Sequence, residues 1–361
     1  MISFFGSPGW SPGKLQDLVL LQRGFDITKV EQKDGDIAVI SSSGPGSRHN
    51  VPKVCGPGVI IGRKGTLGSV FYSETDYWPH DTTLWSKDLK GNNAKFVYYA
   101  LQRIDMSLFD TGAANPTLNR NHIHGLPIFI PERKTQDCIA NILAAYDDLI
   151  ENNRQRIALL EEGARQHYKE WFVRFRFPGH EHVKIIDGMP EGWERLPLGD
   201  VLTLQRGFDL PVSDRNEGAA PVYGSTGIVG FHDVAKVDAP MLITGRSGSL
   251  GQVRFVSIPC WPLNTALWVR EFKRASAWFA YFLLSEMGLE KFNGGASVPT
   301  LDRKVAHAAP VLLPSVRLLE TFDETAQHIF ELIDNLARQN KQIARARDLL
   351  LPKLMSGAIA V

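Results

Sequence analysis

Two long stretches of the chain carry apolar residues at the three- and four-residue steps of an α-helix. In the first, from about 135 to 171, the row consists of Ile139, Ile142, Tyr146, Leu149, Ile157, Leu160 and Ala164, with Asn153 among them. In the second, from about 318 to 351, the row consists of Phe322, Ala326, Ile329, Ile333, Leu336 and Ile343, with Asn340 among them. This spacing predicts two long helices with coiled-coil-like seams, each containing one asparagine that can fix the register. Pro352 predicts the end of the second helix.

The remaining sequence alternates short apolar runs with segments rich in glycine and proline. Four runs predict strands, at residues 59–61, 126–131, 241–243 and 311–314. Residues 96–101 and 279–284 are apolar and aromatic, and they predict short buried helices. The pattern therefore indicates globular parts of mixed α and β structure with many loops.

The sequence repeats itself after 183 positions. The six residues at 21–26 recur at 204–209, and the glycine-rich segment at 62–68 recurs at 245–251. The same offset carries Trp10 onto Trp193 and Arg120 onto Arg303. A gap-free offset of this size indicates two copies of one folding unit. Two copies in one chain are typical of a protein that presents two similar surfaces to its partner, although duplication without present function is the alternative.

We therefore predict an α+β fold, in which two repeated mixed α/β domains are joined by two long helices that pair as an antiparallel coiled coil, with a pseudo-two-fold relation inside the chain. The predicted parts are the first domain at 1–134, the first helix at 135–177, a linker at 178–192, the second domain at 193–317, and the second helix with a tail at 318–361. Each helix is expected to be about 50 Å long. A zipper between two chains is the alternative, and pairing within one chain is favoured because the long intervening domain lets the chain fold back.

Composition limits the class of protein. The 361 residues are 43% hydrophobic and 22% charged, which is typical of a soluble globular protein of two or three domains. We expect cytoplasmic localisation, because we find no membrane-length apolar stretch and no signal-peptide pattern, and three scattered cysteines fit reduced thiols. With 40 basic and 39 acidic residues, any basic surface for nucleic acid has to be local.

Several segments together resemble a known family. They are the glycine-rich segment at 62–68 with its copy, the Asn-Pro-Thr-Leu at 115–118 with its copy at 298–301, and the segments at 189–193 and 221–230. With the succession of globular domain, long helix, globular domain and long helix, they resemble the specificity (S) subunits of type I restriction-modification systems over nearly the whole chain. The copies differ from each other at Ser41, which matches Gly224, and at Asn115, which matches Val298.

The resemblance implies a non-catalytic subunit that recognises DNA. Each globular domain is implied to be a target-recognition domain for one half of a bipartite, gapped double-stranded target. The paired helices are implied to be a spacer that docks two methyltransferase subunits, with restriction subunits joining them. S-adenosylmethionine is expected in the methyltransferase partner, whereas this chain is expected to hold no cofactor and no metal and to bind no membrane.

Basic, hydroxyl and amide side chains are the groups that bond phosphates and base edges. We predict DNA contacts by Ser43, Arg48, His49, Asn50, Arg63, Lys64, Thr66, Thr82, Asn115, Arg120, Ser225, Thr226, His232, Arg246, Ser247, Ser249, Thr265 and Arg303. The glycine-rich loops are expected to bring backbone N–H groups to a phosphate, with a tight structural turn as the alternative.

Residues kept in both copies, including Arg23 and Arg206, fit a scaffold role better than a role in specificity. The matched pair His49 and His232 leaves the same two possibilities open. Specificity is expected where the copies diverge, at residues 27–58 and 210–240.

Two other classes of protein are less well supported. A coiled-coil adaptor that bridges two partner proteins without DNA is the first alternative. A stand-alone DNA-modifying enzyme is the second, but the sequence contains no Gly-x-x-x-x-Gly-Lys-Ser/Thr loop. Residues 115–118 match only part of the Asn/Asp-Pro-Pro-aromatic motif of amino-methyltransferases.

Overall fold

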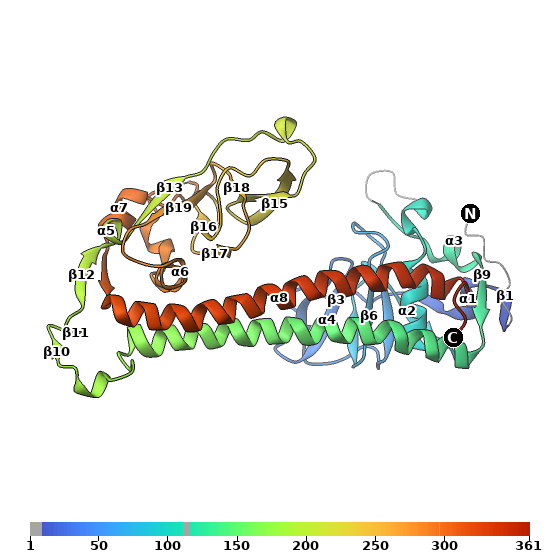
Figure 1. The fold of residues 1–361 in the computed structure, drawn as a ribbon. Coiled ribbons are helices and arrows are strands. Elements are labelled where there is room, and N and C mark those ends of the chain that lie inside the picture. The colour runs from blue at the N-terminus through green and yellow to red at the C-terminus, as the bar shows by residue number, and fades with distance from the viewer. Residues whose placement is uncertain (1–8, 111–115, 296) are drawn as a thin grey trace. The chain divides into compact units, whose positions relative to one another are not determined.

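The computed structural model describes residues 9–110, 116–295 and 297–361, and the chain folds as two compact units (Figure 1). The first unit consists of Met1–Asn152 and Gln339–Val361, and the second unit of Asn153–Arg338. Each unit therefore combines one repeat with a segment of each long helix. The predicted contact at Asn115 lies outside the described residues.

In its described residues the first unit contains three small sheets, with strand orders β2-β8-β5-β6, β4-β3-β7 and β1-β9. The strands are Trp10–Lys14 (β1), Leu20–Arg23 (β2), Ile37–Ser41 (β3), Gly44–His49 (β4), Gly58–Gly62 (β5), Val70–Ser73 (β6), Tyr77–Pro79 (β7), Thr83–Asp88 (β8) and Pro127–Pro131 (β9). The short helices are Leu15–Leu18 (α1), Ala94–Gln102 (α2) and Arg120–His124 (α3).

The second unit repeats these sheets in the same order, as β13-β19-β16-β17, β15-β14-β18 and β12-β20. The strands are Glu194–Pro197 (β12), Leu202–Arg206 (β13), Ala220–Gly224 (β14), Gly227–His232 (β15), Met241–Gly245 (β16), Val253–Val256 (β17), Trp261–Pro262 (β18), Ala266–Phe272 (β19) and Pro310–Leu313 (β20). The short helices are Leu198–Val201 (α5), Ala277–Glu286 (α6) and Arg303–Ala308 (α7). The linker adds a small hairpin of Ile185–Ile186 (β10) and Met189–Pro190 (β11).

The predicted short elements are confirmed. The runs at 59–61 and 241–243 form β5 and β16, which are buried along their whole length between two neighbouring strands. The runs at 126–131 and 311–314 contain β9 and β20. Helices α2 and α6 occupy the two predicted helical segments, and each begins after a polar residue, Asn93 or Ser276, whose side chain caps a backbone N–H.

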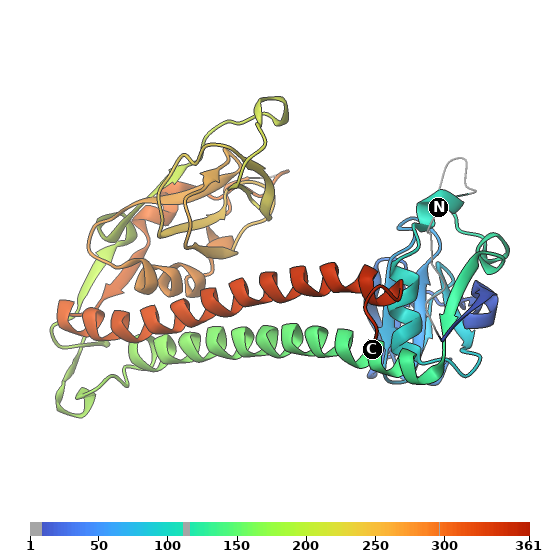
Figure 2. The same cartoon turned by 45° about the vertical axis from the view of Figure 1, so that its right-hand side comes forward.

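Two long helices, α4 (Arg133–Tyr168) and α8 (Val316–Met355), contribute a segment to each unit (Figure 2). In the first unit Arg347 forms an ion pair with Asp147, and Asn340 Nδ2 donates to the carbonyl of Ile150 at 3.3 Å. These two pairings show that the helical segments are antiparallel there. In the second unit the end of α4 meets the start of α8, where the ring centroids of Tyr168 and Phe322 lie 6.1 Å apart.

The structure corrects two details of the predicted helices. Pro352 does not end α8, which continues to Met355, because the last turn buries Leu354 and Met355 in the core of the first unit and so offsets the missing N–H bond. Leu149 is exposed and Ile150 is buried instead. A helix of 3.6 residues per turn drifts against a 3.5-residue repeat, and the buried row therefore moves by one position.

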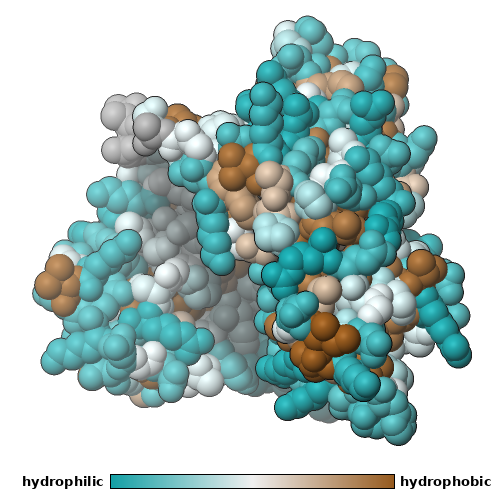
Figure 3. Space-filling model, turned by 90° about the vertical axis from the view of Figure 1, so that its left-hand side faces the viewer, coloured by the Kyte–Doolittle hydropathy of each residue, from teal (hydrophilic) through white to brown (hydrophobic). Residues whose placement is uncertain are grey.

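The other predicted seam positions are buried or half-buried. They are Ile139, Ile142, Tyr146, Asn153, Ile157, Leu160, Ala164, Phe322, Ala326, Ile329, Ile333, Leu336, Asn340 and Ile343. Each unit has one large apolar core of its own, to which both long helices contribute. On the face drawn in Figure 3, hydrophilic residues predominate and hydrophobic ones form separate patches. Among the helices of the described ranges, none combines the length and apolar character that crossing a bilayer requires.

Candidate nucleic-acid interface

A groove of about 840 Å³ opens on the first unit at the end of β2. It is lined by the repeated segment at 21–26, by Asp81 and Lys87, and by Arg120 and His124 of α3. Arg23 comes from the strand end, Lys87 from the neighbouring strand β8, and Arg120 from the first turn of α3. Three basic side chains from three elements therefore surround one concave surface.

The second unit carries the equivalent groove, with a volume of about 740 Å³. It is lined by residues 205–209 and by Lys236, Trp261 and Arg303. Arg206 and Arg303 stand 183 positions after Arg23 and Arg120. The structure thus brings the predicted contacts Arg120 and Arg303 together with the two repeated arginines.

A lysine stacks on two aromatic rings beside each groove. Lys53 Nζ lies 5.1 Å from the ring centroid of Phe25 and 5.5 Å from that of Trp78. Lys236 Nζ lies 5.5 Å from Phe208 and 5.4 Å from Trp261. These distances are those of cation–π contacts, which hold the ammonium groups in place without neutralising them.

His49 and His232 are buried behind the same tryptophans. The ring centroid of each histidine lies 5.3 Å from the ring of Trp78 or Trp261. Nδ1 of His49 accepts a bond from the N–H of Lys33, and Nδ1 of His232 accepts the equivalent bond from Asn216, both at 3.1 Å. This geometry gives both histidines a structural role, because buried rings bonded to the backbone cannot reach a base edge.

The glycine of the repeated segment has a packing reason. A Cβ atom on Gly24 would overlap the carbonyl oxygen of His80, and a Cβ atom on Gly207 would overlap that of Leu263. Only glycine allows this close approach of two backbone segments. Because the preceding Arg23 and Arg206 point into grooves and stay exposed, packing does not explain them in the same way.

The glycine-rich loops are tied to the fold by their backbone. The N–H groups of Arg63 and Lys64 donate to the carbonyl of Thr82, and that of Gly65 donates to Pro116. The second copy makes the equivalent bonds from Arg246, Ser247 and Gly248. These donors are occupied and cannot hold a phosphate.

The arginines of these loops also bond the fold. Arg63 Nη1 donates to the carbonyl of Asp81 at 3.4 Å, and Arg246 Nε donates to the carbonyl of Asn264 at 2.7 Å. Burial, and next the positive charge of Arg23, lower the pKa of Arg63 from its usual value. Arg63 and Arg246 are thus half-buried supports of the turn that carries Asp81 or Asn264.

The remaining predicted contacts are spread over the loops and hairpins beside the grooves. The exposed ones are Ser43, Arg48, Asn50, Lys64, Thr66, Thr226 and Ser249. The half-buried ones are Thr82, Ser225, Ser247 and Thr265. Thr82 Oγ1 accepts from the N–H of Ser42 at 3.2 Å, and Arg48 reaches the exposed Asp36 at 3.4 Å. Of the predicted contacts that the structure describes, only Arg120 and Arg303 line the grooves themselves.

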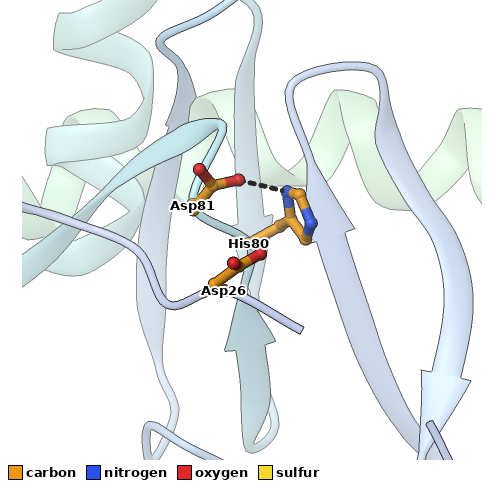
Figure 4. A group of neighbouring side chains, drawn as sticks. All are labelled: Asp26, His80 and Asp81. Carbon is orange, nitrogen blue, oxygen red and sulfur yellow. Dashed lines mark ion pairs between the residues drawn. The ribbon is translucent and has the colours of Figure 1, made fainter. Parts of the chain in front are cut away.

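Among the described residues, Asp26, His80 and Asp81 form a group whose composition suits a cation (Figure 4). Their ligand atoms lie within 4.8 Å of one another. However, Asp81 already pairs with Arg23 at 2.9 Å, and His80 Nδ1 contacts both Asp81 and Thr82. The second repeat has Leu263 in place of His80. An arginine therefore supplies the positive charge at this group, and we assign no metal to it.

Two further histidines that the sequence did not single out support the grooves. Nε2 of His124 accepts from the N–H of Leu21 at 3.0 Å, and Nε2 of His307 accepts from Leu204 at 2.9 Å. Burial lowers the pKa of both imidazoles below the usual 6.5. The signal that could have found them is their exact match across the offset of 183.

Comparison with known proteins gives one consistent family. Residues 8–162 match the model for the type I restriction modification DNA specificity domain. The type I restriction enzyme MjaIX specificity subunit of Methanocaldococcus jannaschii is 25% identical over 307 residues, covering 74% of this chain and 69% of that protein. The HindI specificity subunit of Haemophilus influenzae is 21% identical over 327 residues, covering 68% and 71%. The crystal structure of the type I S subunit from M. genitalium, 20% identical, shares the fold over 96% of both chains with a TM-score of 0.60.

Proposed function

We propose that this chain, a member of the family of type I restriction-modification specificity subunits, reads one DNA sequence in two separate parts, one with each repeat. The subunits of this family determine DNA specificity and are themselves non-catalytic. The observation that carries the proposal is the presence of two equivalent grooves, each lined by an arginine pair and flanked by a stacked lysine. Two similar basic surfaces in one chain suit two patches of one duplex.

Recognition energies favour a divided target. A wrong base pair costs about 1–3 kcal/mol, and such costs add for separated positions. One small domain reads too few pairs to distinguish one site in a genome, whereas two linked domains combine their discrimination. We assign residues 1–134 and 193–317 to the two target-recognition domains, with residues 178–192 as the linker between the first helix and the second domain.

The long helices are the proposed spacer. We infer that α4 and α8 pair along their length as an antiparallel coiled coil, which relates the two repeats by a pseudo-two-fold axis. Helices of 36 and 40 residues are about 50–60 Å long, which exceeds one DNA turn of about 35 Å. The two half-sites are therefore separated by several base pairs that neither repeat reads.

The outer faces of these helices are the proposed docking surface for partner subunits. Leu159 on α4, and Leu332 and Leu349 on α8, are exposed apolar residues on otherwise polar surfaces. Two methyltransferase subunits would cover such residues, and restriction subunits would join this assembly. S-adenosylmethionine is expected in the methyltransferase subunits, where it supplies the methyl group, and this chain contributes the recognition.

Exchange of the diverged segment at 210–240 for the corresponding segment of a relative with a different target tests this function. The chain is produced with its methyltransferase subunit, and methylated sites are mapped in the host genome. The expected result is a gapped two-part motif of which one half changes and the other stays. An unchanged motif contradicts the placement of specificity.

Salt dependence of the same complex separates DNA reading from a protein adaptor. Binding through several phosphates weakens steeply with salt, with a slope in log–log form of about −0.9 for each phosphate contacted. We expect a steep slope on the methylated two-part sequence. Binding that is absent or insensitive to salt favours an adaptor that bridges proteins without DNA.

A further inference from the structure

The two equivalent arginines are held in different ways. Arg23 Nη2 lies 2.9 Å from Asp81 Oδ2, and the side chain of Asp81 is only 19% exposed. The nearest carboxylate to Arg206 is Asp209, at 3.8 Å, with 74% of its side chain exposed. Both arginines are themselves more than half exposed, at 57% and 53%. One guanidinium is therefore fixed against a partly buried anchor and the other is loosely paired at the surface.

The anchor of Arg23 is fixed from a second side. Oδ1 of Asp81 lies 3.1 Å from Nδ1 of His80, so both carboxylate oxygens have a partner (Figure 4). In the second repeat these positions hold Leu263 and Asn264, and Asn264 donates its side-chain amide to Asp209. The second groove thus has a neutral amide where the first has an oriented carboxylate.

This difference changes what each arginine can recognise. A guanidinium paired with a carboxylate carries little net charge toward a phosphate, but its remaining N–H donors are held in a defined plane. Such a planar fork matches O6 and N7 of guanine in the major groove. A loosely paired arginine in a groove with one carboxylate fewer keeps more of its positive charge toward the ligand, which suits a phosphate.

We propose that Arg23, positioned by Asp81, reads a guanine in one half-site, whereas Arg206 at the equivalent place contacts a phosphate. The proposal rests on the proposed DNA-reading function and adds a division of labour to it. Position 81, with its counterpart 264, then determines which of the two tasks the neighbouring arginine performs.

Lysine substitutions separate the two tasks, because lysine keeps the charge and loses the planar fork. The full chain with its methyltransferase subunit is titrated with duplexes that carry single base changes in each half-site. For Arg23→Lys we expect discrimination at one guanine of one half-site to fall by about 5- to 150-fold. For Arg206→Lys we expect the preferred sequence to stay the same. Arg206→Ala is expected to weaken binding to all sequences and to reduce the salt slope by about one.

Asp81→Asn gives the first groove the residue of the second and tests the positioning role. Relaxed discrimination at the same guanine, with a salt slope that is equal or steeper, is the expected result. Unchanged discrimination in the other half-site is the internal control, because it shows that the variant is folded. Equal behaviour of Arg23→Lys and Arg206→Lys overturns the inference. If the unmodified complex recognises no two-part sequence, the proposed function itself fails.

Discussion

Around the groove of the first repeat the chain places His80 and Asp81, and around the groove of the second it places Leu263 and Asn264. The strand orders, the loop bonds and the lysine stacks are the same in both repeats. The difference therefore lies in the side chains beside an arginine and not in the scaffold that positions it. Two copies of one fold can acquire different recognition surfaces in this way while each keeps its own core.

The shared features share a physical cause. They occur where backbone meets backbone, as at Gly24 and Gly207, or where a buried ring accepts a backbone N–H, as at His124 and His307. Positions without such constraints have diverged. On β4 the outward residues are polar or small, whereas β15 exposes Ile228, Val229 and Phe231. A substitution that lowers the free energy of unfolding by different amounts at matched positions of the two repeats would contradict a common scaffold.

The largest effect is expected from adding one carbon atom to the close approach in each repeat. Gly24→Ala and Gly207→Ala place a Cβ atom 2.1 Å and 2.2 Å from a backbone carbonyl oxygen, so the backbone has to shift. Overpacking of this kind costs about 1–3 kcal/mol of unfolding free energy. Urea unfolding of the full chain should show similar losses for the two variants.

Gly163→Ala is the matched control for this substitution. Gly163 lies in α4 with nothing within 4 Å of an added Cβ atom, so alanine should raise the stability by up to about 1 kcal/mol. Tolerance of alanine at Gly24 together with a large loss at Gly207, or the reverse, contradicts a common scaffold.

The fold was predictable from the sequence where periodicity or repetition was strong. Helical spacing predicts the two long helices, and the offset of 183 predicts two copies of one mixed α/β folding unit. The end of α8 was predicted wrongly, because burial of Leu354 and Met355 in a core is a tertiary effect that overrides a proline. Local preference decides an element only where packing does not.

The candidate site was less predictable. Arg120 and Arg303 were predicted as contacts, but the repeated Arg23 and Arg206 fitted a scaffold role better than a role in specificity. The pairing of Arg23 with Asp81 joins residues 58 positions apart, and no local pattern reports it. His49 and His232 fitted both roles as well, and only their burial behind tryptophan rings favours the structural one.

A smaller effect, expected in both repeats, is a loss of stability in acid. Burial keeps His124 and His307 neutral when folded, with pKa values below 6.5, whereas in the unfolded chain they take up protons near pH 6.5. Their contribution to stability is therefore complete above pH 6.5 and is lost as the pH falls through the folded pKa values. The urea midpoint should decrease between pH 8 and pH 5.5.

His124→Gln and His307→Gln test the source of this acid sensitivity. Glutamine offers a neutral acceptor for the N–H of Leu21 or Leu204. Each variant should therefore flatten the dependence of the urea midpoint on pH and lower the free energy of unfolding at pH 8 by about 1 kcal/mol or less. His122→Gln changes an exposed histidine on the same helix and serves as the control. A profile that flattens for only one of the two repeats would show that the shared histidines support their grooves unequally.

The smallest effect is expected from the stacked lysines, and it sharpens the comparison because the two stacks have nearly the same geometry. Lys53→Met and Lys236→Met keep the apolar stem and remove the ammonium group from two aromatic rings. Each substitution should lower the free energy of unfolding, measured in urea, by about 0.5–1 kcal/mol, because both lysines are exposed. Arginine at either position keeps a cation over the rings and should cost less than methionine. The rings of Phe25 and Phe208 belong to the repeated segments that line the grooves. If Lys53→Met lowers the free energy of unfolding and Lys236→Met does not, the second repeat is stable without its cation–π contacts.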